Sequence, residues 1–223
     1  MSESLGVAVL ASGSGTNLQA IIDRLHVRAN VHVHVEAVIG SRPGIGALER
    51  AERHAIPAHT HPPVDDGGDW LRETIEASGA GLVVLAGWLK LIPASVVRSL
   101  RGRIINIHPA LLPSFGGPGM YGRRVHEAVV ESGARVSGAT VHFVDEIYDH
   151  GAIIAQWPVP VLAGDDAEAL ASRVLAIEHR LLPAVVEAYA EGRFELGAAG
   201  RVAWTGPWYP GDEFKMVSNK TTD

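Results

Sequence analysis

The chain has 223 residues, a formal net charge of −6 and no cysteine. The absence of cysteine excludes a disulfide framework, a Cys-ligated zinc site and a thiol nucleophile. No basic run follows the pattern of a nucleic-acid-binding surface, so we expect no nucleic-acid partner. The first apolar stretch is short, breaks in a Gly/Ser loop and has no basic segment before it. We therefore expect neither a signal peptide nor a membrane span, and a cytoplasmic location.

Strands and helices alternate along most of the chain. Short apolar runs bounded by turn residues predict strands, and apolar residues at helical spacing predict helices. The expected elements, in chain order, are a strand over 5–11, a helix over 16–25, a strand over 31–39, helices over 46–54 and 69–78, a strand over 82–86, a helix over 93–100, a strand over 103–108, a helix over 121–131, strands over 136–144 and 153–161, and a helix over 165–189. This order is typical of an α/β fold with a mostly parallel, twisted sheet and helices on both faces. We expect one domain over residues 1–223, of which about 195–223 form a tail rich in Gly, Pro and Trp.

Residues 12–18, with the sequence SGSGTNL, join the first strand to the first helix. Glycine lets the backbone turn sharply and approach a ligand closely, and the free N–H groups at a helix start attract anions. The spacing does not fit the G-x-G-x-x-G pattern of dinucleotide-binding loops, and no Lys follows as in a Walker loop. Two interpretations stay open for this segment: a phosphate-binding loop, or a tight turn that only caps the helix.

Asn106 and His108 lie two residues apart at the end of a predicted strand, which Pro109 terminates. Their side chains share a face because strand side chains alternate. Asp149 follows the next long strand in a turn that can reach the same crevice, and a carboxylate beside an imidazole favours its charged form. An amide and an imidazolium aimed at one point suit the oxyanion of acyl transfer by direct attack of a substrate amine. The alternative is an Asn and a His that are satisfied within the core.

Two other classes of function stay open. A phosphate-binding module without catalysis needs the 12–18 loop but not the polar set at the strand end. A His-based metal hydrolase is suggested by His32-x-His34 and His59-x-His61, since pairs of His can bind zinc. Solvated histidines explain these pairs more simply, and we expect no metal.

The sequence also resembles a known family, the folate-dependent formyltransferases. The resemblance runs from about residue 6 to residue 193 and rests on the segments 11–19 (ASGSGTNLQ), 85–90 (LAGWLK), 106–113 (NIHPALLP) and 138–144 (GATVHFV). Asp149 stands seven residues after His142, as the catalytic aspartate of that family does, and Glu178 precedes His179 on the last helix. The Asn-x-His-Pro block with the downstream Asp is specific to formyl-folate chemistry, and the 12–18 loop favours the branch that acts on glycinamide ribonucleotide. The resemblance implies a Rossmann-like formyltransferase fold.

The resemblance also implies an activity. The formyl group of the co-substrate 10-formyltetrahydrofolate would pass to the amine of 5'-phosphoribosylglycinamide, giving formylglycinamide ribonucleotide and tetrahydrofolate in purine synthesis. Asn106 and His108 would stabilise the oxyanion, while Asp149 keeps His108 protonated and helps to relay the amine proton. The residues implied to hold the ribonucleotide and its phosphate are Gly15, Thr16, Asn17 and Glu178. Those implied for the folate pocket are Leu89, Lys90, Leu91, Ile92, Asn106, Asp145, Glu146, Ile147, Tyr148 and Asp149.

Some positions depart from the better-known members. Lys90 replaces a common Arg, which keeps the charge but not the planar fork. An Arg that some members use against the folate falls near Asp66-Gly67, which leaves the contact to the folate tail open. Residues 116–122 form a longer Gly-rich loop, either a lid or a connection. A deformylase-like hydrolysis by the same three residues is the nearer alternative to transfer, and the assembly is left open, a homodimer included.

Overall fold

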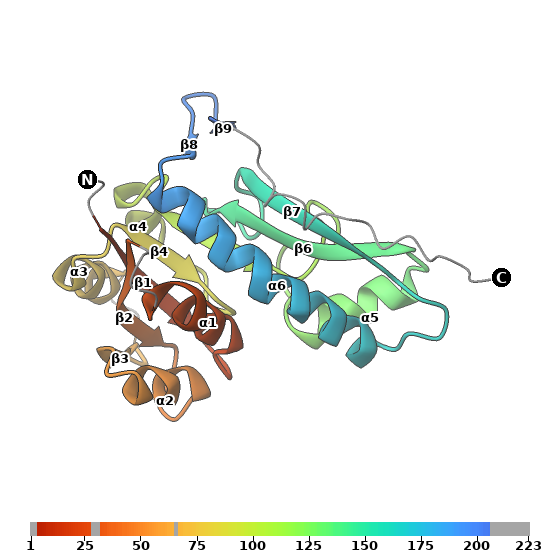
Figure 1. Cartoon of the computed structure of the whole chain (residues 1–223), viewed down its shortest axis with the longest axis horizontal. Helices are drawn as coiled ribbons and strands as arrows, with labels where there is room; N and C mark the ends of the chain where they lie inside the picture. The colour runs from red at the N-terminus through yellow and green to blue at the C-terminus, as the bar shows by residue number, and fades with distance from the viewer. Residues whose placement is uncertain (1–3, 28–31, 65–66, 206–223) are drawn as a thin grey trace.

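A seven-stranded sheet lies at the centre of the computed structural model, which describes residues 4–27, 32–64 and 67–205 (Figure 1). Its strands are β1 (Leu5–Ala11), β2 (Val33–Gly40), β3 (Ala58–Thr60), β4 (Leu82–Leu85), β5 (Ile104–His108), β6 (Val136–Phe143) and β7 (Ile153–Pro160). The helices are α1 (Thr16–Ile21), the π-helical η1 (Ile22–His26), α2 (Gly46–Arg53), α3 (Asp69–Ser78), α4 (Ala94–Ser99), α5 (Arg123–Glu131) and α6 (Ala167–Ala190). A separate hairpin joins β8 (Phe194–Leu196) to β9 (Val202–Trp204).

The order of the strands across the sheet is β3-β2-β1-β4-β5-β6-β7. The first five strands pair in parallel, whereas β6 runs antiparallel to both β5 and β7. The chain leaves β1 toward β2 and β3 and then returns to β4 and β5 on the other side of β1. In open α/β sheets, ligands bind beyond the carboxyl ends of the strands at such a reversal. The α/β fold with a mostly parallel sheet is therefore confirmed.

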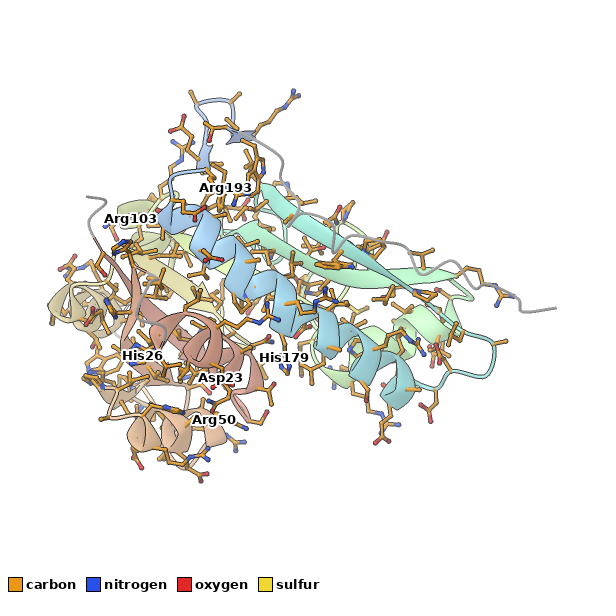
Figure 2. All side chains as sticks on the ribbon, in the orientation of Figure 1. Asp23, His26, Arg50, Arg103, His179 and Arg193 are labelled. Atoms are coloured by element: carbon orange, nitrogen blue, oxygen red, sulfur yellow. The ribbon has the colours of Figure 1, made fainter. Side chains whose placement is uncertain are left out.

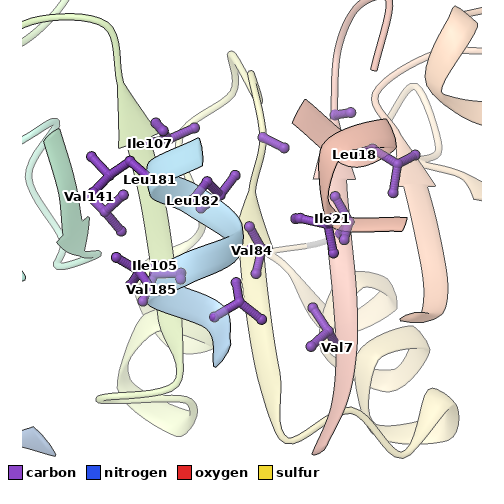
Figure 3. Close-up of a cluster of buried hydrophobic side chains, with 14 of the residues drawn as sticks. Val7, Leu18, Ile21, Val84, Ile105, Ile107, Val141, Leu181, Leu182 and Val185 are labelled. Atoms are coloured by element: carbon purple, nitrogen blue, oxygen red, sulfur yellow. The ribbon is translucent and has the colours of Figure 1, made fainter. Parts of the chain in front are cut away.

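Helices cover both faces of the sheet, as the alternation of elements indicates. Val7 and Val9 of β1 belong to the apolar cluster that includes α1 and α6, whereas Ala8 and Leu10 belong to the cluster with α3 and α4. This division follows from the alternation of side chains along a strand. Figure 3 shows apolar side chains of α6 against those of β4 and β5. In the described ranges, no helix is both long and apolar enough to span a bilayer.

The structure contains elements that the sequence pattern does not predict. The three residues of β3 are all exposed and form no apolar run, so they give no strand signal. The helix expected over 16–25 divides into α1 and η1. The start of the expected tail forms the β8–β9 hairpin, where the indole Nε1 of Trp204 donates to the carbonyl oxygen of Ile154 at 3.2 Å. Residues 206–223 of that tail lie outside the described residues.

Candidate active site

A cavity of about 810 Å³ lies at the carboxyl ends of β1, β4 and β5. Its lining comes from these strand ends, from the loop before α5, and from α5 and α6. The residues proposed from the sequence that line it are Asn17, Leu89, Asn106, His108, Tyr148, Asp149 and Glu178. Those that do not line it are Gly15, Thr16, Lys90, Leu91, Ile92, Asp145, Glu146 and Ile147.

The imidazole of His108 is 3% exposed and faces a protein acceptor at each ring nitrogen. Its Nε2 lies 2.8 Å from the carbonyl oxygen of Phe115, and its Nδ1 lies 3.5 Å from Oδ2 of Asp149. The expected proximity of His108 and Asp149 is confirmed. Because a carbonyl oxygen only accepts, the proton of the neutral ring belongs on Nε2. A second proton, on Nδ1, would then face the Asp149 carboxylate.

Both partners of His108 have an unusual backbone conformation. Phe115 has a φ of 57° and Asp149 a φ of 54°, in the left-handed region that non-glycine residues rarely adopt. Such residues cost about 1–3 kcal/mol each and cluster at functional sites. The backbone N–H of Gly117 donates to Oδ2 of Asp149 at 2.9 Å, which ties the two segments together. A Cβ at Gly116 would lie 2.5 Å from Cδ2 of Leu112, so a larger residue there would require the Leu112 side chain to shift.

His142 completes the cluster, although sequence reasoning gave it no role. It stands opposite Asn106 in the register of β5 and β6, and the Asn106 amide donates to its Nε2 at 3.1 Å. The His142 Nδ1 donates to the carbonyl oxygen of Phe143 at 2.7 Å, and Nε2 also lies 3.7 Å from Oδ1 of Asp149. The Asn106 amide keeps its second N–H and its oxygen for a ligand.

Burial and charge act in opposite directions on this cluster. Burial lowers the pKa of His108, and Asp149 and the Phe115 carbonyl raise it by less, so the pKa stays below 6.5. Burial raises the pKa of Asp149, but the contacts with His142, His108 and Gly117 hold it below its ordinary value. Burial and the Asp149 carboxylate therefore act on the His108 imidazole in opposite directions, and burial has the larger effect. That Asp149 keeps His108 protonated stays a prediction: the nearby carboxylate favours the charged ring, and burial opposes it.

Thr140 fixes the turn that follows His108. Its buried hydroxyl donates to the carbonyl oxygen of Ala110 at 2.6 Å and accepts from the N–H of Leu112 at 3.1 Å. The Gln156 amide donates to the same hydroxyl at 3.1 Å and to the carbonyl oxygen of Leu112 at 2.8 Å. Thr140 is also the register partner of His108, so β6 and β7 together hold the loop that carries Phe115.

The expected phosphate loop is held against the first turns of α2. The N–H of Ala47 donates to the carbonyl oxygen of Gly13 at 3.2 Å, and Nε of Arg50 donates to that of Ser14 at 2.8 Å. Gly15 has a φ of 75°, and a Cβ there would lie 2.6 Å from Cα of Ala47. The carbonyls of this loop therefore face α2, and only glycine fits at position 15.

Arg50 extends the same contact to α1. Its Nη1 donates to Oε1 of Gln19 at 2.9 Å, and the Gln19 amide donates to Oδ1 of Asp23 at 2.8 Å. Figure 2 labels Arg50 on α2, Asp23 on η1 and His179 on α6. One guanidinium thus ties the loop, α1 and α2 together. Sequence reasoning missed Arg50 because its partners lie 31 and 36 residues away.

Asn17 and Glu178 meet at the cavity from the first and last helices. The Asn17 amide donates to Oε2 of Glu178 at 2.7 Å, and the two residues are 8% and 7% exposed. Within the described chain, Oδ1 of Asn17 has no hydrogen-bond partner. Burial raises the pKa of Glu178, and the bond from Asn17 lowers it by less. The structure thus brings the 12–18 segment and Glu178 to one place.

The residues expected at the folate pocket have differing surroundings. Leu89 and Tyr148 line the cavity. The Nζ of Lys90 lies 3.2 Å from Nδ1 of His61, outside the cavity lining. Ile92 is buried in the core with α3 and α4. The exposed apolar side chains in these segments are Leu89, Leu91, Ile147 and Tyr148.

The turn that carries Asp149 is ordered by its own side chains. Oδ1 of Asp145 accepts from the N–H of Ile147 at 2.9 Å, and Oδ2 lies 2.8 Å from Nδ1 of His150. Glu146 forms a 3.2 Å ion pair with Arg98 on α4. These contacts explain how Asp145 and Glu146 shape the turn without lining the cavity.

The Gly-rich loop expected as a lid or a connection lines the cavity from Gly117 to Gly122. Trp88 and His126 also line it, and sequence reasoning assigned them no role. Asp66, at the position of the missing Arg, lies outside the described residues. Across the described ranges, no three His, Asp or Glu side chains are grouped as a metal site requires.

Proteins of similar sequence have established names. A family model described as Formyl transferase matches residues 5–186. The chain is 44% identical over 192 residues to the chloroplastic phosphoribosylglycinamide formyltransferase of Vigna unguiculata, with 84% of this chain and 61% of the relative aligned. It is 36% identical over 197 residues to the phosphoribosylglycinamide formyltransferase of Escherichia coli (strain K12), covering 86% of this chain and 90% of the relative. The chain spans 61% and 66% of the lengths of the plant relatives from Vigna unguiculata and Arabidopsis thaliana.

Solved structures of named proteins share the fold. Phosphoribosylglycinamide formyltransferase from Anaplasma phagocytophilum matches with a TM-score of 0.84 and 35% identity, covering 92% of this chain and 95% of that chain. A formyltetrahydrofolate deformylase from Pseudomonas syringae pv. tomato matches with a TM-score of 0.79 and 26% identity, covering 91% of this chain and 66% of that chain. The folds of the two are about equally similar, but the sequence is less similar to the deformylase.

Proposed function

Since the chain belongs to the formyl transferase family, we propose that it transfers the formyl group of 10-formyltetrahydrofolate to the amine of 5'-phosphoribosylglycinamide. The products are formylglycinamide ribonucleotide and tetrahydrofolate. The observation that carries this proposal is the single cavity that holds Asn106, His108 and Asp149 together with Asn17 and Glu178. The names of the relatives support this choice of acceptor.

The reaction exchanges one carbon–nitrogen bond for another. The amine nitrogen attacks the formyl carbon, and the carbonyl electrons move to oxygen. The bond from that carbon to the folate nitrogen then breaks as the carbonyl re-forms, and one proton passes from the amine to the leaving nitrogen. The second N–H of Asn106, which His142 leaves free, donates to the oxyanion. His142 is thus a positioning residue, because it fixes the plane of that amide.

His108 acts once the ligands fill the cavity. Both of its ring nitrogens face protein acceptors. To donate to the oxyanion, His108 therefore gives up one of these two contacts and forms a hydrogen bond to the ligand in its place. A developing negative charge favours the protonated imidazole, and Asp149 adds to this effect. Asp149 also relays the amine proton, through water, to the leaving nitrogen. Two donors aimed at the oxyanion account for acceleration without a protein nucleophile.

The remaining residues bind the two substrates. Gly15, Thr16 and Asn17 take the phosphate, held in place by Arg50 and α2, and Glu178 contacts the ribonucleotide. The folate lies against Asn106, Asp149, Leu89 and Tyr148, which line the cavity. A part in folate binding for Lys90, Leu91, Ile92, Asp145, Glu146 and Ile147 stays a prediction from the resemblance. One formyltransferase domain over residues 1–223, a cytoplasmic location and no metal requirement stay predictions, and the assembly stays open, a homodimer included.

Hydrolysis of the formyl-folate is the second candidate, because the same residues can activate water and a deformylase shares the fold. The test is the absorbance change of 10-formyltetrahydrofolate with the wild-type protein, in the presence and absence of glycinamide ribonucleotide. We expect consumption only when the ribonucleotide is present. Consumption without it, with release of formate, would establish a deformylase instead. No consumption in either case would contradict both candidates.

A further inference from the structure

Five buried side-chain polar atoms have no hydrogen-bond partner in the described part of the chain. Three of them belong to residues that line the cavity, which are Asn17, Trp88 and His126. Buried polar groups in proteins are nearly always paired, and an unpaired group destabilises the fold. Their concentration around one cavity shows that the protein alone does not satisfy all the polar groups of this wall.

His126 is the member of this set that is furthest from any assigned role. It lies on α5 and is 5% exposed, between the fully buried Val125 and Val129. Arg123 and Glu127 pair with each other at 2.7 Å on the exposed side of the same helix. His126 is therefore the buried polar side chain that α5 places at the cavity, next to the exposed Arg123, which also lines it.

The chemistry of the His126 ring follows from its surroundings. Nδ1 of His126 is buried and has no hydrogen-bond partner, whereas Nε2 is not among the buried, unpaired atoms of the described chain. A neutral imidazole has one N–H, and an unpaired buried acceptor is tolerated better than an unpaired donor, which places the proton on Nε2. Burial lowers the pKa of His126, and the nearby His108 adds to this effect. The ring is thus a neutral donor.

We propose that His126 is a further binding residue for the amine substrate and donates its Nε2–H to an uncharged oxygen of that substrate, a hydroxyl or a carbonyl. The inference rests on the proposed function. It favours the amine substrate because α5 packs against α6, the helix that carries Glu178. The folate side of the cavity is formed by other segments, those of Leu89 and Tyr148.

The test compares His126→Leu, His126→Gln and the matched control Ser137→Ala in steady-state formyl transfer. Ser137 also has a buried oxygen without a partner, but it does not line the cavity. For His126→Leu we expect the KM for glycinamide ribonucleotide to rise roughly tenfold, with kcat and the KM for 10-formyltetrahydrofolate nearly unchanged. The Gln variant, which keeps a donor, should recover part of this loss. Ser137→Ala should leave both KM values unchanged.

Thermal unfolding separates binding from packing. Leu removes an unpaired polar group and fills the space with apolar atoms, so Tm should rise by roughly 2–6 °C while ribonucleotide affinity falls. An unchanged KM for the ribonucleotide in both His126 variants overturns the inference, as does an equal loss of affinity for both substrates. If Leu prevents folding, the Gln variant decides between these outcomes. A wild-type protein that consumes no formyl-folate with the ribonucleotide overturns the proposed function, and this inference with it.

Discussion

The side-chain amide of Asn17 donates a 2.7 Å hydrogen bond to the carboxyl group of Glu178, which lies 161 residues further along the chain. The bond joins the first turn of α1 to the middle of α6 at the wall of the cavity. It leaves Oδ1 of Asn17 unpaired, on the side of the molecule where the ribonucleotide is proposed to bind.

Glu178→Gln should weaken ribonucleotide binding and stabilise the fold in a pH-dependent way. Because burial raises the pKa of Glu178 above 4.5, folding favours its protonated form. That contribution is present in full below the unfolded pKa and is lost as pH rises through the folded-state value. Gln can still accept from Asn17 and never ionises. The Tm advantage of the variant should therefore grow as pH rises from near 4.5 through the raised folded-state pKa of Glu178.

Thermal unfolding of both proteins across this range, followed by circular dichroism, is the measurement. Asp166→Asn serves as a control, because Asp166 is an exposed N-cap whose side chain accepts from the N–H of Ala169 and does not line the cavity. The Tm difference between Glu178→Gln and wild type is independent of pH only if ionisation of Glu178 leaves the stability of the fold unchanged. A constant difference would therefore contradict the prediction.

Asp149→Asn should lower the pKa of His108 still further. Asp149 raises the pKa of that imidazole against the effect of burial, and Asn removes the charge while keeping the shape. The measurement is the titration of the His108 ring nitrogens by nuclear magnetic resonance in the two proteins. Formyl transfer should fall about 100-fold or more, as for the loss of a positioned proton-transfer group. A pKa of His108 that rises or stays constant would contradict the assigned contact.

Arg50→Met should raise the KM for glycinamide ribonucleotide about tenfold, because the carbonyl of Ser14 and the amide of Gln19 lose their shared donor. The KM for 10-formyltetrahydrofolate should not change. Arg53→Met is the matched control, since Nε of Arg53 reaches only the carbonyl of Glu49 on its own helix. Equal effects of the two substitutions would show that Arg50 acts through charge or helix stability and not through the loop.

Gly15→Ala should destabilise the protein by about 1–3 kcal/mol or more, which lowers Tm by several degrees. The reason is the positive φ at Gly15 together with the close approach of Ala47. Gly13→Ala is the control in the same loop, because a Cβ there meets no atom within 4 Å. Thermal unfolding is the readout. If both variants melt at the wild-type temperature, α2 does not hold the loop as described.

The sequence predicts the parts of the fold that depend on local pattern. The parallel strands appear as apolar runs, and the alternation along β5 correctly places Asn106 and His108 on one face. The exposed edge strand at Ala58–Thr60 has no such pattern and is missed. The Trp204 hairpin is missed for a related reason, since two strands of three residues carry too little periodicity to identify.

The sequence predicts only those residues of the site that lie at the end of a strand or in the turn just after one. Asp149 is found because its turn can reach the end of β5. The partners of His108 and Asn106 depend instead on the antiparallel register of β6, which pairs Asn106 with His142, and on the backbone of Phe115. The effect of burial on the pKa of His108 cannot be read from the sequence, because it depends on how deeply the packed chain buries the ring.

The fate of the formyl carbon tests the central claim most directly. 10-Formyltetrahydrofolate labelled with carbon-13 in its formyl group can be incubated with the wild-type protein and glycinamide ribonucleotide and followed by nuclear magnetic resonance. We expect the label to appear in an amide carbon bonded to the glycinamide nitrogen, with tetrahydrofolate formed in equal amount. Label that appears in free formate, at a rate independent of the ribonucleotide, would contradict formyl transfer to the amine.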